Sequence, residues 1–337
     1  MDNKLLQIEN LNTSFYTHVG EVKAVRGITF DLNRGEAIGI VGESGCGKSV
    51  TMMSLLRLLT DTGKIKEGKA IFDGVDLTKM TDAEMAKIRG NDIGMIFQDP
   101  MTSLNPVYTV GNQLREPLMR HKKMSKAEAN QRAIDLLKLV GIPEAEKRLT
   151  QYPHEFSGGM RQRVMIAMAL TCEPKLLIAD EPTTALDVTI QAQILDLMKD
   201  IKTKLNTSII LITHDLGVVA DICHRINVMY GGKIVEQGSS RDIFYRPSHV
   251  YTLGLLRSVP NPKLITKERL KPIDGQPPDL LNPPPGCPFA PRCEHCMGIC
   301  EQQMPPFFDL GEGHQAACWL NHPNAPKVEG FGGRRDA

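Results

Sequence analysis

The chain has 337 residues, and its 40 lysine and arginine residues nearly balance its 39 aspartate and glutamate residues, which leaves a formal net charge of +1. This length accommodates one large domain plus a smaller one, and the balanced charge argues against a nucleic-acid-binding surface as the main purpose. No apolar run approaches the about 18 residues that span a bilayer, and the N-terminus lacks the basic and apolar segments of a signal peptide, so we expect a cytoplasmic protein.

The first part of the chain is predicted to be rich in β-strand. Short apolar or alternating runs are separated there by turn residues, as is typical of strands. The predicted strands are residues 5–8, 28–32, 37–41, 69–74 and 93–97. A helix is expected to begin at Lys48, directly after a glycine-rich segment.

Residues 107–150 have a different character and are predicted to be largely helical. Apolar residues recur at helical spacing between positions 124 and 140. Ser125 and Glu128 fit a capping box, in which each side chain satisfies a free backbone N–H at the start of a helix. We therefore expect a helical subdomain, at about residues 100–155, inserted into an α/β core.

Strands and helices alternate through the second half of the chain. The predicted elements are a helix from Ser157 to about Cys172, a strand at 176–179, a helix at 187–205, a strand at 208–212, a further helix, strands at 226–230 and 233–237, and a last helix at 250–258. This alternation implies a largely parallel, doubly wound sheet. Proline becomes frequent from Val259 onward, where we expect an extended, poorly helical stretch.

The segment Gly42-Glu43-Ser44-Gly45-Cys46-Gly47-Lys48-Ser49 fits the phosphate-loop pattern G-x-x-x-x-G-K-S and lies between a predicted strand and a predicted helix, as the motif requires. Its glycines let backbone N–H groups curve around phosphate oxygens, and the helix N-terminus adds a favourable partial charge. Lys48 is expected to reach the β- and γ-phosphates, and Ser49 to ligate Mg²⁺. Cys46 needs only to be small, so we do not interpret it as a redox switch. The residues assigned to the nucleotide are Gly42, Ser44, Gly45, Cys46, Gly47, Lys48 and Ser49.

Polar residues at the ends of three predicted strands complete a candidate hydrolytic site. Asp180 closes an apolar strand and is expected to hold Mg²⁺, through water. Glu181 is the candidate that polarises the attacking water. His214 follows the strand at 208–212 and is expected to contact the γ-phosphate. Gln98 ends the strand at 93–97 and could reach Mg²⁺ or water while passing movement to the helical segment.

Taken in order, these motifs resemble those of the ATP-binding cassette (ABC) ATPases over about residues 4–258. The matching segments are the Walker A motif at 42–49, the Q-loop at Gln98, the signature at 157–160, the Walker B motif at 176–181, the D-loop at 185–187 and the switch histidine at His214. The resemblance implies a P-loop NTPase cassette with a mainly parallel sheet core, an antiparallel β subdomain and a helical subdomain. It also implies a head-to-tail dimer in which each ATP lies between two cassettes.

The same resemblance assigns roles to residues outside the phosphate loop. Ser157, Gly158 and Gly159 would contact the ATP of the partner cassette, with the dipole of the following helix directed at it. The family often has Gln where this chain has Met160, which removes one polar contact. Further nucleotide contacts are implied for Asp187 in the D-loop and for Phe15 as the adenine platform, with Tyr16 as the alternative.

Three segments resemble a narrower branch, the peptide and nickel importers: residues 98–106, 152–160 and 285–293. The whole chain is similar to the dipeptide/oligopeptide ATP-binding subunits. That likeness implies two membrane permease subunits, a second ATPase that is related or identical, an extracytoplasmic peptide-binding protein and no nucleic acid. It places the chain at the cytoplasmic face of the cell membrane as a peripheral subunit. The alternatives are an importer of nickel or another small solute, a soluble ABC ATPase of translation or DNA repair, and an iron–sulfur redox sensor with an attached ATPase.

Five of the eight cysteines gather near the C-terminus: Cys287, Cys293, Cys296, Cys300 and Cys318. In a cytosolic chain such a group indicates a metal site before it indicates disulfides. Thiolates in this number can hold Zn²⁺ or an iron–sulfur cluster, and their spacing alone does not decide. The resemblance to peptide-importer subunits favours a [4Fe–4S] cluster on Cys287, Cys293, Cys300 and Cys318, with Cys296 as the spare. We therefore expect an ATP-binding domain at 1–258 and a Pro/Cys-rich C-terminal domain at 259–337.

Overall fold

The computed structural model describes residues 3–184, 186–258, 272–328 and 331. Their contacts form two compact units, each of which is described by itself. Unit 1 comprises Met1–Asn3, Asn33–Ala37 and Lys79–Ile212, and unit 2 comprises Lys4–Leu32, Ile38–Thr78 and Thr213–Ala337. Ala185 of the D-loop and the first part of the proline-rich stretch, 259–271, lie outside the described residues. Within the described ranges, the helices are too short or too polar to span a bilayer.

Unit 1 contains three parallel strands, β6 (Ile93–Ile96), β7 (Leu176–Asp180) and β8 (Ser208–Thr213, whose last residue falls in unit 2), in the order β6-β7-β8. Every residue of β7 and β8 is buried. Strands covered on both faces appear in sequence as continuous apolar runs rather than alternating ones. The strands predicted at 93–97, 176–179 and 208–212 are confirmed for this reason.

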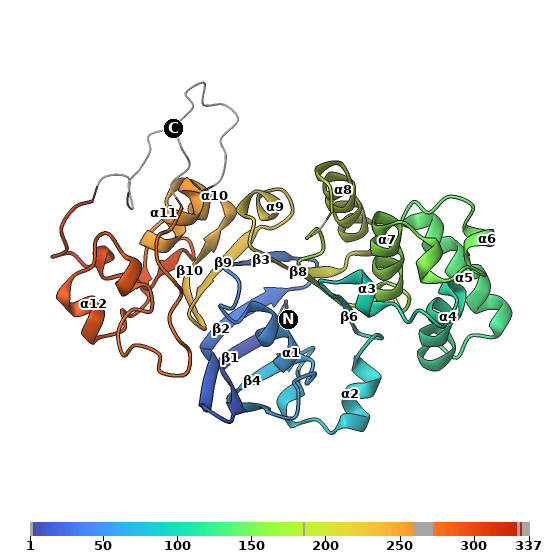
Figure 1. Ribbon diagram of the computed structural model, residues 1–337, viewed down its shortest axis with the longest axis horizontal. Helices are drawn as coiled ribbons and strands as arrows, with labels where there is room; N and C mark the ends of the chain where they lie inside the picture. Colours follow the sequence, from blue (N-terminus) through green and yellow to red (C-terminus); the bar gives the residue numbers. More distant parts are fainter. Residues whose placement is uncertain (1–2, 185, 259–271, 329–330, 332–337) are drawn as a thin grey trace. The chain divides into compact units, whose positions relative to one another are not determined.

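The rest of unit 1 is helical (Figure 1). Its helices are α2 (Asp82–Ile88), α3 (Pro100–Ser103), α4 (Val110–His121), α5 (Lys126–Leu139), α6 (Ala145–Arg148), α7 (Gly158–Ala169) and α8 (Val188–Leu205), with the 3₁₀ turn η2 (Pro153–Glu155). The 3₁₀ turn η1 (Leu77–Lys79) lies at the boundary, with two of its residues in unit 2 and Lys79 in unit 1. The predicted capping box is present, since the Glu128 N–H donates to Ser125 Oγ at 3.3 Å and the Ser125 N–H to Glu128 Oε2 at 2.8 Å. Contacts of α3, α4 and α5 with α7 join the predicted helical segment to the signature helix. The predicted end of α7 at Cys172 is three residues too late.

Unit 2 contains a four-stranded sheet in the order β2-β1-β4-β5, in which β1–β4 and β4–β5 are antiparallel. The strands are β1 (Lys4–Thr17), β2 (Gly20–Asn33), β4 (Gly63–Phe72) and β5 (Val75–Asp76). β1 and β2 are longer than the apolar runs predicted for them, because exposed or half-buried and mostly polar residues lie between their buried apolar ones. The predicted strand at 69–74 overruns a turn, where Asp73 and Gly74 adopt φ values of 49° and 82°.

The other strands of unit 2 do not all run parallel to their neighbours. β3 (Ala37–Val41) and β9 (Arg225–Tyr230) are parallel, but β10 (Lys233–Ser239) is antiparallel to β9. Two glycines with positive φ, Gly231 and Gly232, form the connection, and a two-residue link can only join antiparallel neighbours. The sheet that the sequence predicts to be largely parallel therefore has an antiparallel pair here.

Helices α1 (Lys48–Leu55), α9 (Leu216–Ala220), α10 (Ser240–Tyr245) and α11 (Val250–Arg257) complete the cassette part of unit 2. The C-terminal segment, residues 272–328, has short elements: η3 (Ala290–Arg292), α12 (Gly298–Gln302), β11 (Phe308–Asp309), β12 (Gln315–Ala316) and η4 (Trp319–Asn321). β12 pairs antiparallel with β10, Glu236 opposite Ala316 and Gln237 opposite Gln315. This pairing places the C-terminal segment in the same compact unit as the phosphate loop (Figure 1).

Candidate functional site

The phosphate loop connects β3 to α1 in unit 2, and its backbone requires glycine at two positions. A Cβ atom on Gly42 would lie 2.2 Å from the carbonyl oxygen of Met229. A Cβ atom on Gly47 would lie 2.4 Å from the carbonyl oxygen of Ala24, and Gly47 also has a φ of +100°. Glycine is the one residue that fits both the close approach and the left-handed backbone. The loop therefore follows a tight, glycine-dependent path, as is typical of phosphate loops.

Lys48 is buried inside this loop. Its Nζ donates to the carbonyl oxygens of Gly42 at 2.6 Å and Glu43 at 3.0 Å. The thiol of Cys46 is also buried, and burial raises its pKa, so that it stays neutral and unreactive at pH 7. That environment agrees with a residue chosen for small size. The loop thus holds the ammonium group of Lys48 against two of its own carbonyl oxygens.

The other predicted nucleotide contacts of the loop lie on its open side. Ser44 and Gly45 are exposed, and a Cβ on Gly45 would meet nothing within 4 Å. Ser49 is half-buried in the first turn of α1, which contains no acidic residue. The partial positive charge of this helix end is therefore available to an anion.

Phe15 and Tyr16, the two aromatic candidates, have different surroundings on β1. The Phe15 ring covers Gly63 of β4, where an added Cβ would approach it to 2.8 Å. The Tyr16 hydroxyl accepts a hydrogen bond from Lys66 Nζ at 2.6 Å. Tyr16 is thus engaged with lysine, whereas half-buried Phe15 has an apolar ring fixed on the strand. His214, also in unit 2, directly follows β8 and is exposed.

The acidic half of the predicted site lies in unit 1, at the end of β7. Asp180 is the last residue of the strand and is buried. Glu181 follows with a φ of 47°, a left-handed conformation that costs a residue with a side chain about 1–2 kcal/mol. Its Oε2 accepts hydrogen bonds from Gln98 Nε2 and Thr184 Oγ1, both at 3.0 Å. The structure therefore brings two predicted residues together, Gln98 and Glu181, and a strained backbone fixes the carboxylate at the strand tip.

The signature lies at the start of α7, also in unit 1. Ser157 is the N-cap and accepts a hydrogen bond from the Met160 N–H at 3.4 Å. Ser157 and Gly158 are exposed, and Gly159 packs against Ile190 of α8. The first turn of α7 therefore faces solvent with its N-terminal end.

Asp187 caps a helix. Its Oδ1 accepts a hydrogen bond from the Ile190 N–H at 3.0 Å at the start of α8, and the residue is exposed. A nucleotide contact for Asp187 stays a prediction.

Sequence reasoning missed Gln162 and Thr184. Gln162 is buried in α7, and its Nε2 donates to the carbonyl oxygen of Pro182 at 2.6 Å. This bond ties the signature helix to the loop that follows Glu181. The sequence gives one hint of this contact, which is that Gln162 is a polar residue shortly before the apolar run of α7.

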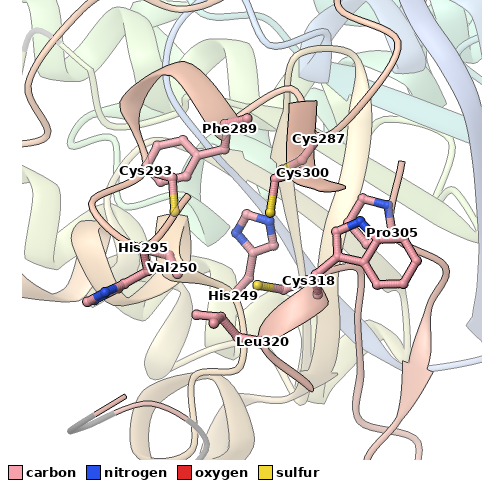
Figure 2. A pocket seen from close by; sticks show the side chains of 12 residues that line it. His249, Val250, Cys287, Phe289, Cys293, His295, Cys300, Pro305, Cys318 and Leu320 are labelled. Atoms are coloured by element: carbon pink, nitrogen blue, oxygen red, sulfur yellow. The ribbon is translucent and has the colours of Figure 1, made fainter. Parts of the chain in front are cut away.

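Four cysteines of the C-terminal segment line one small cavity in unit 2. They are Cys287, Cys293, Cys300 and Cys318. Cys296 is exposed and is not part of the lining. Figure 2 shows these side chains around the imidazole of His249, which enters the same space. The cavity volume is about 10 Å³, room for roughly one water molecule.

His249 brings an unused hydrogen-bond donor to this cavity. Burial lowers its pKa to about 3, so the ring is neutral. Its Nδ1 accepts from the Tyr251 N–H at 3.1 Å, which leaves the hydrogen on Nε2. That Nε2 is buried without a hydrogen-bond partner among the described residues. A buried donor of this kind calls for an acceptor in the cavity.

The lining of the cavity suits a thiolate-bound group by its chemistry. Burial raises the pKa values of the Cys287 and Cys318 thiols to about 12 and of Cys293 to about 11, and none of the lining cysteines forms a disulfide. Within the described part of the chain, groups of three or more Cys, His, Asp or Glu side chains arranged to hold a metal ion are absent. The lining therefore offers soft sulfur ligands around a common space.

Comparisons with protein families and solved structures agree on the cassette. A family model described as "ABC transporter" matches residues 25–184, and one described as "Oligopeptide/dipeptide transporter, C-terminal region" matches residues 235–300. The dimeric structure of a post-hydrolysis state of the ATP-binding cassette MJ0796 bound to ADP and Pi superposes with a TM-score of 0.64 at 28% identity, covering 70% of this chain and 99% of that chain. CbiO1 from Clostridium perfringens gives a TM-score of 0.61 at 30% identity, covering 72% and 91%. The predicted cassette fold is confirmed.

Full-length relatives are more similar still. The chain is 56% identical over 334 residues to the dipeptide transport ATP-binding protein DppD of Bacillus subtilis (strain 168), covering 99% of each chain. It is 57% identical over 327 residues to the oligopeptide transport ATP-binding protein OppD of the same organism, covering 97% of this chain and 91% of the relative. The chain therefore belongs to the ABC transporter family, within its group of dipeptide and oligopeptide transport ATP-binding proteins.

Proposed function

We propose that this chain is the ATP-hydrolysing subunit that energises import of dipeptides or oligopeptides through a membrane ABC transporter. The observation that carries the proposal is the 56% identity to a dipeptide transport ATP-binding protein over 99% of both chains. The phosphate loop around Lys48 and the fixed carboxylate of Glu181 supply the parts that ATP hydrolysis needs. Peptide rather than nickel is the favoured solute because the relatives compared above are named for peptides.

The chain's own residues divide the work of hydrolysis. Lys48 and the loop N–H groups hold the phosphates, while Ser49 and Asp180 hold Mg²⁺, with Gln98 as a further contact. Bound Mg²⁺ supplies neutralisation of the charge that develops on the phosphate oxygens. Glu181 accepts the proton of the attacking water. Gln98, whose Nε2 lies 3.0 Å from Glu181 Oε2, orients the carboxylate toward that water. His214 contacts the γ-phosphate, and Phe15 stacks on the adenine.

The assembly we propose is a head-to-tail pair of cassettes on a membrane complex. Ser157, Gly158 and Gly159 serve the ATP of the partner cassette, because the open N-terminus of α7 can receive a phosphate. The partners are two permease subunits, a second ATPase that is related or identical, and an extracytoplasmic peptide-binding protein acting through the complex. The chain works as a peripheral subunit at the cytoplasmic face of the membrane. The dimeric state of the MJ0796 cassette supports the pairing.

Replacement of Glu181 by Gln tests the hydrolytic role. We expect ATP binding to persist and turnover to fall by a factor of about 10²–10⁴, as for loss of a general base. Asp200→Asn, at an exposed residue of α8, is the matched control and should hydrolyse ATP at the wild-type rate. Wild-type turnover in Glu181→Gln would remove the assigned role.

Reconstitution tests the solute. Permease subunits should co-purify with the chain from membranes. Their ATPase activity in vesicles should rise with peptide-loaded binding protein and not with nickel-loaded binding protein. Stimulation by nickel alone would make the chain a nickel importer's ATPase, and failure to co-purify any permease would contradict transport.

We further propose that Cys287, Cys293, Cys300 and Cys318 bind a [4Fe–4S] cluster, with Zn²⁺ as the competing group. The four thiols share one cavity, and the Nε2–H of His249 can donate to a cluster sulfur. When bound, the cluster supplies a cross-link between segments that have few apolar contacts of their own. Cys296 stays outside as the spare.

Anaerobic purification tests this site. We expect a brown protein containing iron and sulfide, with Cys318→Ser losing the colour and exposed Cys296→Ser keeping it. A colourless preparation that contains zinc would exclude the cluster. Loss of colour in both variants would contradict the assignment of Cys296.

A further inference from the structure

Arg292 joins the C-terminal segment to the phosphate loop. It lies at the end of η3, next to Cys293, and its side chain is only 4% exposed. Its Nη1 donates to Glu43 Oε2 at 2.6 Å and its Nη2 to Glu43 Oε1 at 3.0 Å. This is a bidentate arginine–carboxylate pair, the strongest and most directional form of ion pair in proteins.

Every N–H group of this guanidinium has an acceptor. Beyond the pair with Glu43, Nε donates to the carbonyl oxygen of Asp274 at 2.8 Å and Nη2 to that of Ile273 at 2.9 Å. Nη1 also donates to the hydroxyl of Tyr230 at 3.1 Å. A guanidinium has five donors in a rigid plane, so five acceptors fix its orientation completely. Lysine cannot reproduce that geometry.

Glu43 is held at its backbone as well as at its side chain. Its N–H donates to the Tyr251 hydroxyl at 2.8 Å, and its carbonyl oxygen accepts from Lys48 Nζ at 3.0 Å. Two residues later the loop is open at Gly45. The fixed end of the loop is therefore the end that contacts Arg292, and Lys48 is attached to it.

The charge of Glu43 makes the pair functionally relevant. A carboxylate next to Gly42 lies in a loop whose purpose is to bind negatively charged phosphates. Without a cation it would repel the phosphates and attract the ammonium of Lys48 toward itself. Arg292 neutralises this carboxylate from a buried position, where solvent screens the interaction little.

Aromatic packing connects the same arginine to the cysteine cavity. The guanidinium lies 5.8 Å from the centroid of the Tyr230 ring and 6.0 Å from that of Phe289. The Phe289 ring is in turn 5.3 Å from Tyr251 and 6.0 Å from His249. Phe289 also lines the cavity. The cysteine-bearing segment and the phosphate loop thus share one packed contact region.

We propose that Arg292 is a positioning residue for the phosphate loop, and that the C-terminal segment sets the affinity for Mg·ATP through the Arg292–Glu43 pair. This inference rests on the proposed ATP-binding function. This role differs from a purely structural one, in which Arg292 would hold the C-terminal segment in place and its loss would lower stability alone. The charge argument further requires that loss of Arg292 be corrected by removing the carboxylate it neutralises.

The test uses the purified full chain and four variants. Mg·ATP affinity is measured by titration calorimetry, hydrolysis by phosphate release, and stability by thermal unfolding. We expect Arg292→Met to weaken Mg·ATP binding and raise KM about tenfold, with kcat nearly unchanged. Arg292→Lys should recover part of the affinity, and Glu43→Gln in the Arg292→Met background should restore most of it. The control is Arg257→Met, at an exposed pair with Glu294 in the same unit, and it should bind as wild type does.

Two results would overturn the inference. One is wild-type Mg·ATP affinity in Arg292→Met. The other is lowered stability with no recovery of affinity in the double variant, which would make Arg292 an anchor only. If the wild-type chain binds ATP without hydrolysing it, the proposed function is refuted. The inference about Arg292 is then still tested by the Mg·ATP affinities of the variants relative to the wild type. Wild-type chain that does not bind ATP refutes both.

Discussion

The buried pair of His314 and Glu236 gives a stability prediction that can be worked out from the structure. Glu236 on β10 is fully buried and His314, beside β12, is 3% exposed at its side chain. His314 Nε2 lies 2.8 Å from Glu236 Oε1. The same carboxylate accepts the N–H groups of Ser248 at 2.7 Å and His249 at 3.0 Å. It therefore joins β10, the start of α11 and the C-terminal segment.

Removing the histidine should cost a moderate amount of stability. Loss of a hydrogen bond to a buried carboxylate costs about 1.5–3 kcal/mol. A larger penalty of about 3–5 kcal/mol applies when removal of one partner leaves a buried charge uncompensated. Glu236 keeps two backbone donors in His314→Ala, so we expect about 2–3 kcal/mol. Glu236→Gln should cost a similar amount because its amide must face one of those N–H groups.

The chain's single tryptophan offers a local probe for this experiment. Trp319 lies in η4 of the C-terminal segment, where its Nε1 donates to the carbonyl oxygen of Gln303 at 3.0 Å. Urea unfolding followed by Trp319 fluorescence gives the free energy of each variant. A double-mutant cycle of His314→Ala with Glu236→Gln then isolates the pair. Arg257→Ala, which removes an exposed ion pair, should cost less than about 1 kcal/mol. If His314→Ala costs no more than this control, the buried pair does not hold the segment.

Two further predictions concern the phosphate loop and the acid limb of stability. Gly42→Ala places a Cβ 2.2 Å from a carbonyl oxygen, so this variant should lose Mg·ATP binding in titration calorimetry. In Gly45→Ala the added Cβ meets open space, so circular dichroism should show that the variant keeps its fold, at a cost in stability of about 1–2 kcal/mol. Burial alone would raise the pKa of Asp242, but hydrogen bonds from Ser239 and Arg246 outweigh burial and hold that pKa below its usual value. The stabilisation that ionised Asp242 contributes is present above the unfolded-state pKa of about 4 and is lost as pH falls through the folded-state pKa. Asp242→Asn should therefore make the free energy of unfolding depend less steeply on pH on the acid side. An unchanged slope would contradict this.

Features encoded in one short stretch of chain could be predicted from the sequence. The phosphate loop, the helix start at Lys48 and the capping box of Ser125 each depend on neighbouring residues, so spacing and chemistry were sufficient. The buried strands β7 and β8 were also clear from their continuous apolar runs. In these places local physics and the fold point to the same answer.

Pairings between distant residues could not be predicted from one sequence. Arg292 and Glu43 lie 249 positions apart, and the residues around each of them give no indication that the two side chains pair. His249 looks like an ordinary polar residue at a helix start, and only its burial identifies it as a donor to the cysteine cavity. The antiparallel pairing of β9 with β10 does have a local signal, because the adjacent glycines Gly231 and Gly232 between two strands are typical of a hairpin.

The sharing of unit 2 by both ends of the chain has a consequence for synthesis. Unit 1 has all of its residues once Ile212 has emerged from the ribosome. Unit 2 cannot be completed then, because its residues from Thr213 onward, including the paired strands β10 and β12 and the Arg292 that binds Glu43, have still to emerge. Contacts between such distant positions form late. A chain that stops before Arg292 and β12 would therefore have a complete unit 1 and a unit 2 whose phosphate loop lacks the ion pair of Glu43. We expect such a truncated chain to bind Mg·ATP more weakly than the 337-residue chain.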